Sequence, residues 1–433
     1  MEHMLRPYRE VLARPGALAF SSAGVLARLP MSMVGIAIVL AVPEVYGSYA
    51  LAGQITAVYV IVHAVAAPLL AHLVDRYGQA RIMTPALRVA GVGIAGVIAA
   101  IALEAHPAWI FASAIVAGAS IGSVGALVRA RWTYVLRDPA EIHTAYSLES
   151  ALDEFVFIVG PVVATVLSTS VAPTAGLWLP AAAVLVGGWL LLSQRVTEPP
   201  VVRRAPGAPG GSILRSGGMV VLTLVFAAVG SIFGATDVAT VAFAEEQGSK
   251  SAAGAVLAVF ACGSMLSGLG YGLKHWTSPL WRRFALGVVA LAAGVSLFFV
   301  VTSLPMLAAV MFVTGFTIAP TIINGNGLVT SFVRHDQLTT GLAWVGTALG
   351  VGVSIGSAAA GAAVDGNGAH GGFLVVAASA AFAVLATLVA LPTLRAGHVE
   401  VVPVAVPQAP PAPAPEPEAV GQATVVPNSA PRP

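Results

Sequence analysis

Twelve long apolar stretches, separated by short polar segments, follow one another between about residues 17 and 395. An α-helix needs about 20 apolar residues to cross the hydrocarbon core of a bilayer, and each stretch is long enough. In the first half they cover residues 17–41, 49–72, 83–103, 108–130, 143–170 and 174–193. In the second half they cover residues 218–243, 251–273, 284–303, 305–330, 338–364 and 371–394. The pattern predicts an all-α integral membrane protein with twelve transmembrane helices.

A sequence repeat divides the chain into two halves. Residues 47–53 read GSYALAG, and residues 248–254, which lie 201 positions later, read GSKSAAG. Both copies fall between the first and second apolar stretches of their half, so the spacing measures one repeat of about six helices. Duplicated halves of this kind are typical of secondary transporters. We therefore expect two pseudo-symmetric six-helix bundles, at residues 17–193 and 218–395.

The segments outside these bundles are polar or rich in proline. Residues 194–217 contain PPVVRRAPGAPGGS, a composition that favours a flexible linker between the bundles. Ten prolines fall in the last 33 residues, which predicts a disordered tail at 396–433. Residues 1–16 are expected to form an N-terminal segment ahead of a retained first helix rather than a cleaved signal peptide.

Basic residues gather on one side of the predicted helices. With both termini placed in the cytoplasm, eighteen of the 21 Lys and Arg residues fall in cytoplasmic segments. Arg28 and Arg88 lie within predicted helices, and Lys250 falls in an outer loop. Cytoplasmic loops of membrane proteins carry such an excess of basic residues. We therefore expect a multi-pass protein of the cell (inner) membrane with both termini cytoplasmic.

Composition narrows the functional class. Hydrophobic residues make up 57% of the chain and charged residues only 9%, and the net charge of +2 gives no sign of a nucleic-acid partner. The single cysteine, Cys262, excludes an intramolecular disulfide. The sequence has no nucleotide-binding Gly-Lys loop and no His and carboxylate cluster with metal-ligand spacing. We expect no enzyme, no cofactor and no metal site, but a monomeric transporter in the lipid bilayer driven by protons, with sodium as the alternative.

Two short motifs resemble those of a transporter family. Residues 71–82 read AHLVDRYGQARI, which resembles the cytoplasmic signature G-x-x-x-D-R-x-G-R-R of the major facilitator superfamily at Asp75, Arg76 and Gly78. Gly160 and Pro161, within EFVFIVGPVVAT, resemble the Gly-Pro element of the antiporters of that superfamily. The resemblance covers about residues 15–395, and it implies two six-helix bundles around a central cavity, alternating access and a drug-efflux-like subset.

Small residues four positions apart predict close helix packing. Such pairs are Gly118 and Gly122, Gly230 and Gly234, and Gly350 and Ser354.

Ionisable residues inside a membrane span are costly unless they are paired or face water, so they mark candidate functional groups. Arg28 in the first helix and Asp153 and Glu154 in the fifth lie at similar depth, which predicts that Arg28 pairs with one of these carboxylates. Glu149 shares a helix face with Asp153, and repulsion between the two favours Asp153 as a proton carrier. The alternative to this repulsion is that Glu149 pairs with Arg129 or Arg131 at the inner end of the fourth helix. Arg28, Glu149, Asp153 and Glu154 are thus the proton-coupling candidates, and a static ion pair is the competing interpretation.

The signature loop suggests a conformational latch. We expect Asp75 to contact a helix N-terminus or a basic group such as Arg129, so that Asp75, Arg76, Gly78 and Arg129 hold the inner side closed. Structural bracing is the alternative.

The resemblance also implies that the first, fourth, seventh and tenth helices line the cavity. Residues at middle depth in these helices are Met31, Ser120, Ser123, Phe226, Phe233, Thr317, Thr321 and Asn324, and Asp237 lies nearer the outer end. This set is mostly apolar, with few hydroxyl and amide groups, which suits an amphipathic molecule better than a sugar. The sequence thus favours proton-coupled efflux of a lipophilic or amphipathic small molecule. Nutrient uptake by proton symport, or a non-transporting sensor or scaffold, are the alternatives.

Overall fold

The computed structural model describes residues 6–201, 213–249, 252–274 and 276–396, and every regular element in these residues is a helix. The central part of the predicted linker and the predicted tail lie outside the described residues. In the first half the helices are α1 (Arg6–Leu12), α2 (Ala17–Tyr46), α3 (Tyr49–Tyr77), α4 (Gln79–Ala102), α5 (Pro107–Ile121), α6 (Val124–Val135), α7 (Pro139–Ser170) and α8 (Ala175–Ser193). In the second half they are η1 (Ile213–Arg215), α9 (Gly217–Glu246), α10 (Ala253–Tyr271), α11 (Leu280–Ser296), η3 (Leu297–Val300), α12 (Leu304–Gly315), α13 (Ile318–Phe332), η4 (His335–Gln337), α14 (Leu338–Val389) and α15 (Leu391–Arg395).

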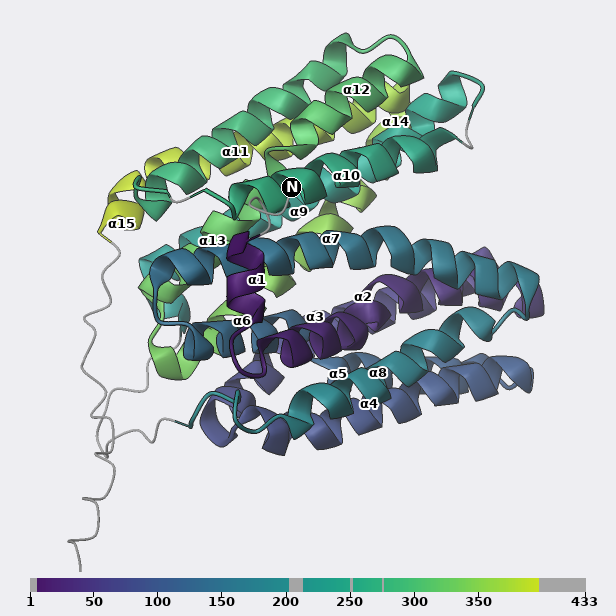
Figure 1. The fold of residues 1–433 in the computed structure, drawn as a ribbon. Coiled ribbons are helices and arrows are strands. Elements are labelled where there is room, and N and C mark those ends of the chain that lie inside the picture. Colours follow the sequence, from purple (N-terminus) through teal and green to yellow (C-terminus); the bar gives the residue numbers. More distant parts are fainter. Residues whose placement is uncertain (1–5, 202–212, 250–251, 275, 397–433) are drawn as a thin grey trace, which may run out of the picture. The chain divides into compact units, whose positions relative to one another are not determined.

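The helices fall into two groups that follow the predicted halves. Figure 1 shows α2 to α8 beside one another and α9 to α12 in a second group above them. We call α2 to α8 the N bundle and α9 to α14 the C bundle. The end at which α3 and α8 terminate and α14 begins is called the linker end.

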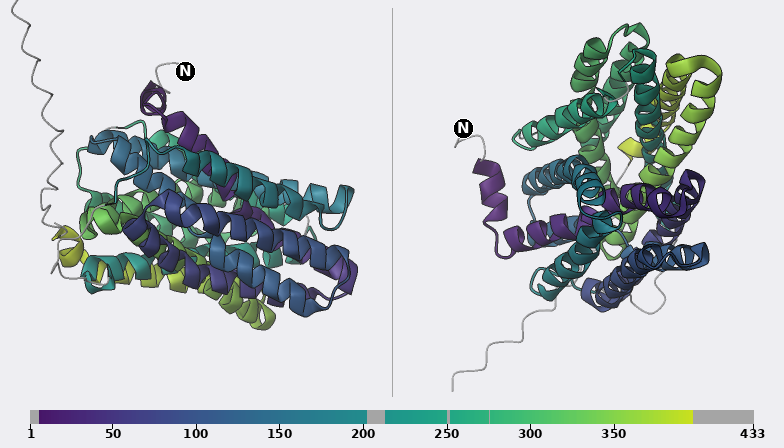
Figure 2. Two further views of the ribbon diagram at one scale, coloured as in Figure 1. Left: turned by 90° about the horizontal axis from the view of Figure 1, so that it is seen from below. Right: turned by 90° about the vertical axis from the view of Figure 1, so that its right-hand side faces the viewer.

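The number of membrane crossings agrees with the prediction. Eleven helical segments of the described residues are long and apolar enough to cross a membrane, and the last of them, His335–Val389, has 55 residues. Within it, Asn367 (φ −135°) and Gly368 (φ 63°) leave the helical conformation. The chain reverses there, as the folded-back yellow-green segment in Figure 2 shows, so α14 comprises two crossings. The backbone N–H of Ala369 donates to Glu246 Oε1 at the end of α9 (2.6 Å), which satisfies one free donor at the start of the second crossing.

The fourth crossing of each half is interrupted near its middle. Between α5 and α6, Gly122 adopts a positive φ of 62°, which L side chains rarely tolerate, and Ser123 is also non-helical. Between α12 and α13, Phe316 and Thr317 keep right-handed dihedrals, so the second interruption is a tight turn rather than a full break. The fourth crossing of each half therefore consists of two helices, and the second of these begins inside the membrane region.

Glycines set the closest helix contacts. In the C bundle, Gly230 and Gly234 of α9 lie against the backbone of α14 at Leu349 and Val353, where a Cβ would overlap carbonyl oxygens. This agrees with the first of the C-bundle packing pairs. The other pair was wrong in register, because Gly350 faces open space. Two different glycines of α14, Gly352 and Gly356, make the close approach to α9.

In the N bundle, the Gly160–Pro161 element lies on α7 where that helix meets α2. A Cβ at Gly160 would overlap the Ser32 hydroxyl. Gly160 thus permits the close packing of α2 and α7 that brings the charged side chains of these helices together.

The short helix α1 also connects the two bundles. Arg14, which follows α1, forms an ion pair with Glu141 of α7 (2.5 Å). The Tyr8 hydroxyl donates to the carbonyl oxygen of Leu269 in α10 (2.5 Å), and burial raises the Tyr8 pKa. The sequence prediction treated residues 1–16 as a simple terminal segment and missed this contact.

Candidate functional site

Four charged side chains meet inside the N bundle and form what we call the charge cluster: Arg28, Arg129, Glu149 and Asp153. Arg28 Nη1 donates to Asp153 Oδ1 (2.6 Å), and Arg28 Nη2 donates to Glu149 Oε2 (2.5 Å). Arg129 Nη2 donates to the second oxygen of Asp153 (2.7 Å). The side chains of Arg28 and Glu149 are 1% and 0% exposed, so water screens this part of the cluster very little.

The cluster balances two positive charges with two negative ones and leaves few polar atoms free. Glu149 Oε1 accepts hydrogen bonds from the Ser21 hydroxyl (2.6 Å) and the Trp132 indole N–H (2.8 Å). Arg28 Nε donates to the carbonyl oxygen of Gly24 one turn earlier in α2 (3.1 Å). A buried charge is tolerated when it is paired and hydrogen-bonded in this way. The sequence signalled neither Ser21 nor Trp132.

The predicted contact between Arg28 and Asp153 is present. The prediction that Glu149 pairs with Arg129 or Arg131 was wrong, because Arg28 lies between the two carboxylates and binds both. The repulsion expected between Glu149 and Asp153 is therefore offset by the guanidinium that they share.

Glu154 has a different environment from its neighbour Asp153. It lies midway along α7 and accepts a hydrogen bond from the hydroxyl of Ser264, a buried residue of α10 (2.7 Å). Among the described residues no basic side chain forms an ion pair with Glu154. Because adjacent residues of a helix point about 100° apart, Asp153 faces α2 and α6 while Glu154 faces the C bundle. Glu154 is thus a carboxylate at the contact between the bundles.

Asp75 joins the bundles at the linker end. Its Oδ2 accepts hydrogen bonds from the backbone N–H (2.8 Å) and the hydroxyl (2.6 Å) of Thr340, and its Oδ1 accepts one from the N–H of Thr339 (3.2 Å). Both donors lie in the first turn of α14, where a carboxylate also interacts favourably with the helix dipole. The expected contact with a helix N-terminus is therefore present. Arg129 is not its partner, because Arg129 binds Asp153 in the charge cluster.

The other residues of the predicted latch lie beside this contact. The Arg76 guanidinium lies 5.1 Å from the centre of the Tyr77 ring. Gly78 ends α3 with a φ of 96°, a conformation that favours glycine, so it shapes the turn into α4.

A second polar network at the linker end was not predicted. Arg131 donates to Gln79 Oε1 (2.8 Å), to the Gln194 carbonyl oxygen (2.9 Å) and to the Thr197 hydroxyl (2.8 Å). Glu198 Oε1 accepts a hydrogen bond from the N–H of Ala80 in the first turn of α4 (2.8 Å). The start of the linker is thereby held against α4 and α6. Gln79 occupies a position at which the family signature has a basic residue. This difference was the one feature of the sequence that pointed to the network.

The residues predicted to line a cavity fall into two environments. Those with partly or well exposed side chains are Met31, Ser120, Ser123, Phe233, Asp237 and Thr317. Phe226, Thr321 and Asn324 are instead buried in the C bundle. The Phe226 ring covers Gly325, the Thr321 hydroxyl donates to the Thr317 carbonyl oxygen (2.7 Å), and Asn324 Nδ2 donates to the Tyr271 hydroxyl (2.9 Å). We therefore exclude these three from the surface available to a substrate in this conformation.

Sequence comparison identifies the family. The family model of the Major Facilitator Superfamily matches residues 20–303 and 279–424, which together cover nearly all of the chain. No curated protein sequence matches the chain.

Solved structures share the fold at low sequence identity. The human organic anion transporter MFSD10 (TETRAN) is 17% identical, with a TM-score of 0.66, and the match covers 87% of this chain and 99% of that one. A bacterial homologue of the iron transporter ferroportin, in an outward-facing state, is 13% identical, with a TM-score of 0.68 and coverage of 86% and 99%. A bacterial homologue of ferroportin in an outward-facing state with soaked iron is 13% identical, with a TM-score of 0.66 and coverage of 88% and 98%. The family match, the membrane-crossing helices and the shared fold agree, and the chain is a multi-pass membrane transporter that belongs to the Major Facilitator Superfamily.

Proposed function

We propose that this protein exports an amphipathic organic molecule in exchange for protons, by alternating access of a site between its two bundles. The observation that carries the proposal is the environment of Glu154, a carboxylate midway along α7 that faces the other bundle. An ionisable residue at the centre of a membrane helix is costly, so its presence there indicates a function. Glu154 accepts one hydrogen bond, from Ser264 of the opposite bundle, and that bond must change when the bundles separate.

Glu154 suits proton transfer better than the other carboxylates. Asp153 is bound by two arginines and Glu149 by one arginine, one indole and one hydroxyl. Protonating either would leave a buried guanidinium without its counter-charge, which is costly. Protonating Glu154 removes no ion pair, because its partner is a neutral hydroxyl. The sequence favoured Asp153, and the geometry moves our proposal to the adjacent residue.

The charge cluster then has a supporting role in this scheme. Its closed set of ion pairs fixes the rotation of α7 relative to α2 and α6. The same rotation turns Glu154 toward α10.

The contacts of Asp75 support the alternating-access part of the proposal. Asp75 joins α3 to the start of α14, and Thr144 of α7 donates to the carbonyl oxygen of Gly272 beyond α10 (2.9 Å), also at the linker end. Breaking these few hydrogen bonds would let the bundles part there. The excess of basic residues at this end makes it the cytoplasmic side in our proposal, so the described conformation is the one closed toward the cytoplasm.

The proposed substrate follows from the side chains that remain accessible. Met31, one of the predicted cavity residues, is 49% exposed on α2, which suits an apolar body. Phe233 and Asp237 share a face of α9, so an aromatic surface lies next to a carboxylate that could bind a cationic group. The first turn of α6, which begins after Ser123 without a side-chain cap, offers backbone donors to an acceptor atom.

The substrates named for the structural neighbours fit less well. An organic anion would need a free cation, yet Arg28 and Arg129 are bound within the charge cluster. An iron ion would need several ligands together, and the described residues contain no group of three His, Cys, Asp or Glu side chains that could hold a metal.

The test is transport by wild type, E154Q, S264A and D153N in cells that lack other exporters. We expect wild type to lower the accumulation of a cationic lipophilic dye, and a protonophore to abolish this. E154Q should lose the dependence on the proton gradient while purified E154Q, in proteoliposomes, still exchanges external for internal dye. S264A should shift the pH dependence of export rather than abolish it.

Two results would contradict the proposal. If E154Q exports dye with the same response to a protonophore as wild type, Glu154 does not carry the coupled proton. If wild type raises rather than lowers accumulation, the direction is uptake.

A further inference from the structure

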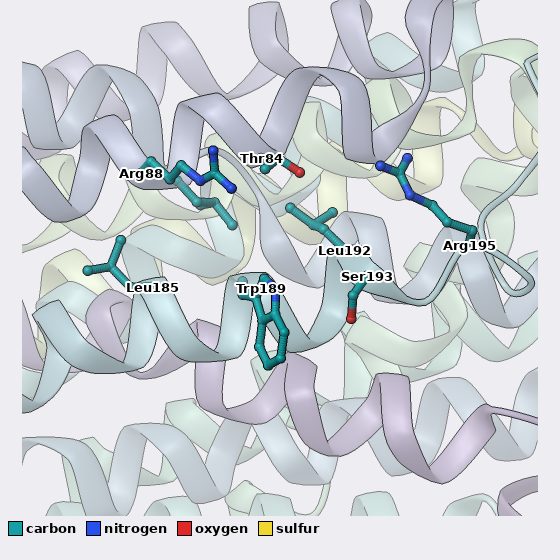
Figure 3. Close-up of a pocket in the computed structure, with 9 residues that line it drawn as sticks. Thr84, Arg88, Leu185, Trp189, Leu192, Ser193 and Arg195 are labelled. Carbon is teal, nitrogen blue, oxygen red and sulfur yellow. The ribbon is translucent and has the colours of Figure 1, made fainter.

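A groove on the outer surface of the N bundle lies apart from the proposed transport path. It runs between α4 and α8 and has a volume of about 210 Å³. Figure 3 shows the side chains along it, with the guanidinium groups of Arg88 and Arg195 approaching from opposite ends and Thr84 between them. Its full lining is Thr84, Leu87, Arg88, Leu185, Gly188, Trp189, Leu192, Ser193 and Arg195.

Arg88 is the unexplained residue of this groove. It is the tenth residue of α4, about 14 Å along the helix from its start at the linker end. Its side chain is exposed, and its neighbours Val89 and Val92 are 45% and 70% exposed on the same outer surface. Among the described residues no carboxylate forms an ion pair with Arg88. A cation on a lipid-facing surface at this depth needs an anion or water, because the hydrocarbon cannot solvate it.

The groove has the chemistry to supply that anion from a lipid. Arg195 lies just beyond the end of α8, where a lipid headgroup would lie, and its ion pair with Glu198 (3.2 Å) leaves the Arg195 side chain 65% exposed. Thr84 adds a hydroxyl group that can donate to a phosphate oxygen, whereas the Ser193 hydroxyl donates to the Leu190 carbonyl oxygen (3.1 Å). Arginine binds phosphate well because its planar fork presents several donors.

The groove also has apolar side chains that are open at the surface. Leu185 is 42% exposed and Trp189 is 64% exposed, so both present an open apolar surface. Tryptophan is enriched at the level of lipid headgroups, where its N–H stays near polar groups while its ring contacts acyl chains. The groove therefore combines a phosphate-binding edge with a surface for an acyl chain.

We propose that the groove between α4 and α8 binds an anionic glycerophospholipid, with its phosphate between Arg88 and Arg195 and an acyl chain along Leu185 and Trp189. The lipid supplies the negative charge that Arg88 lacks and fills the gap between two helices. Binding would hold α4 and α8 together on the face of the N bundle that turns away from the C bundle.

The test is native mass spectrometry of the purified full-length protein with equal amounts of phosphatidylglycerol and phosphatidylcholine. Wild type should retain phosphatidylglycerol in preference. R88Q should lower the retained phosphatidylglycerol about tenfold or more, because a hydrogen bond between charged groups is lost, whereas R88K should keep most of it. R81Q is the matched control, since Arg81 is exposed seven residues earlier on the same helix but does not line the groove.

A second measurement does not depend on recovering the arginine variants. Phosphatidylglycerol brominated on its acyl chains should quench the fluorescence of wild type more than that of W189F, and brominated phosphatidylcholine should show a smaller difference. Equal retention of both lipids by wild type, or an equal loss in R81Q and R88Q, would overturn the proposal. So would a wild-type dimer that R88Q converts to a monomer, because the groove would then bind a second copy of the chain.

Discussion

Replacing Asp153 with asparagine should destabilise the N bundle far more than replacing the adjacent Glu154 with glutamine. Asp153 accepts charge-assisted hydrogen bonds from Arg28 (2.6 Å) and Arg129 (2.7 Å). The asparagine oxygen can keep one of these bonds, but its amide N–H would face the other guanidinium. Removing one partner of a buried ion pair lowers the free energy of unfolding by about 3–5 kcal/mol. Because one hydrogen bond survives in D153N, we expect a loss of about 3 kcal/mol.

Glu154 provides the matched control, because it lies next in sequence and on the same helix. Its carboxylate accepts one hydrogen bond from Ser264, and a glutamine oxygen can accept the same bond. We expect E154Q to change the free energy of unfolding by about 1 kcal/mol or less.

A double-mutant cycle separates charge balance from packing. R129Q in the D153N background restores equal numbers of positive and negative charges in the charge cluster. The double variant should therefore be more stable than the sum of the two single effects predicts, by about 1–2 kcal/mol. The assay is unfolding in mixed micelles by added dodecyl sulfate, followed by tryptophan fluorescence. Equal destabilisation by D153N and E154Q, or a double variant less stable than the sum, would refute the reasoning.

Three further predictions concern the bundle contacts and the helix breaks. D75N should weaken the contact with Thr340 and so expose the linker end of α14. Single cysteines placed there, in a Cys262-free background, should then react faster with a thiol label, and an unchanged rate would argue against a latch. G234L should prevent recovery of folded protein, because the side chain would overlap the backbone of α14, whereas G350L, in open space, should be recovered at the wild-type level by size-exclusion chromatography. G122A should lower the midpoint of thermal unfolding for two reasons. An alanine at this positive φ costs about 1 kcal/mol or more, and its Cβ would lie 2.6 Å from the Met83 methyl group. An unchanged midpoint would mean that the chain between α5 and α6 can become helical.

The sequence predicted those features that depend on position along a helix. Apolar length identified the crossings, and the rise per residue placed Arg28 at the depth of Asp153. The 100° step between neighbouring residues of a helix also accounts for Asp153 and Glu154 facing different partners. Each of these inferences uses only the geometry of one helix.

Features that depend on how a helix is rotated against its neighbours could not be predicted. α14 contains glycines at several spacings, and the sequence does not tell whether the pair beginning at Gly350 or the one beginning at Gly352 faces α9. The partner of Glu149 was wrong for the same reason, because three arginines were within reach along the helices. The hydrogen bond between Glu154 and Ser264 joins different bundles, and nothing in the pattern of either segment indicates it.

The turn at Asn367 and Gly368 decides whether the chain crosses the membrane an odd or an even number of times. Without it, the 52 residues of α14 would form one helix about 78 Å long, far more than a bilayer core of about 30 Å can contain. One such crossing would place the two ends of the chain in different compartments. With the reversal the number of crossings is even, so we expect reporters fused at Arg6 and Arg395 to respond to the same compartment.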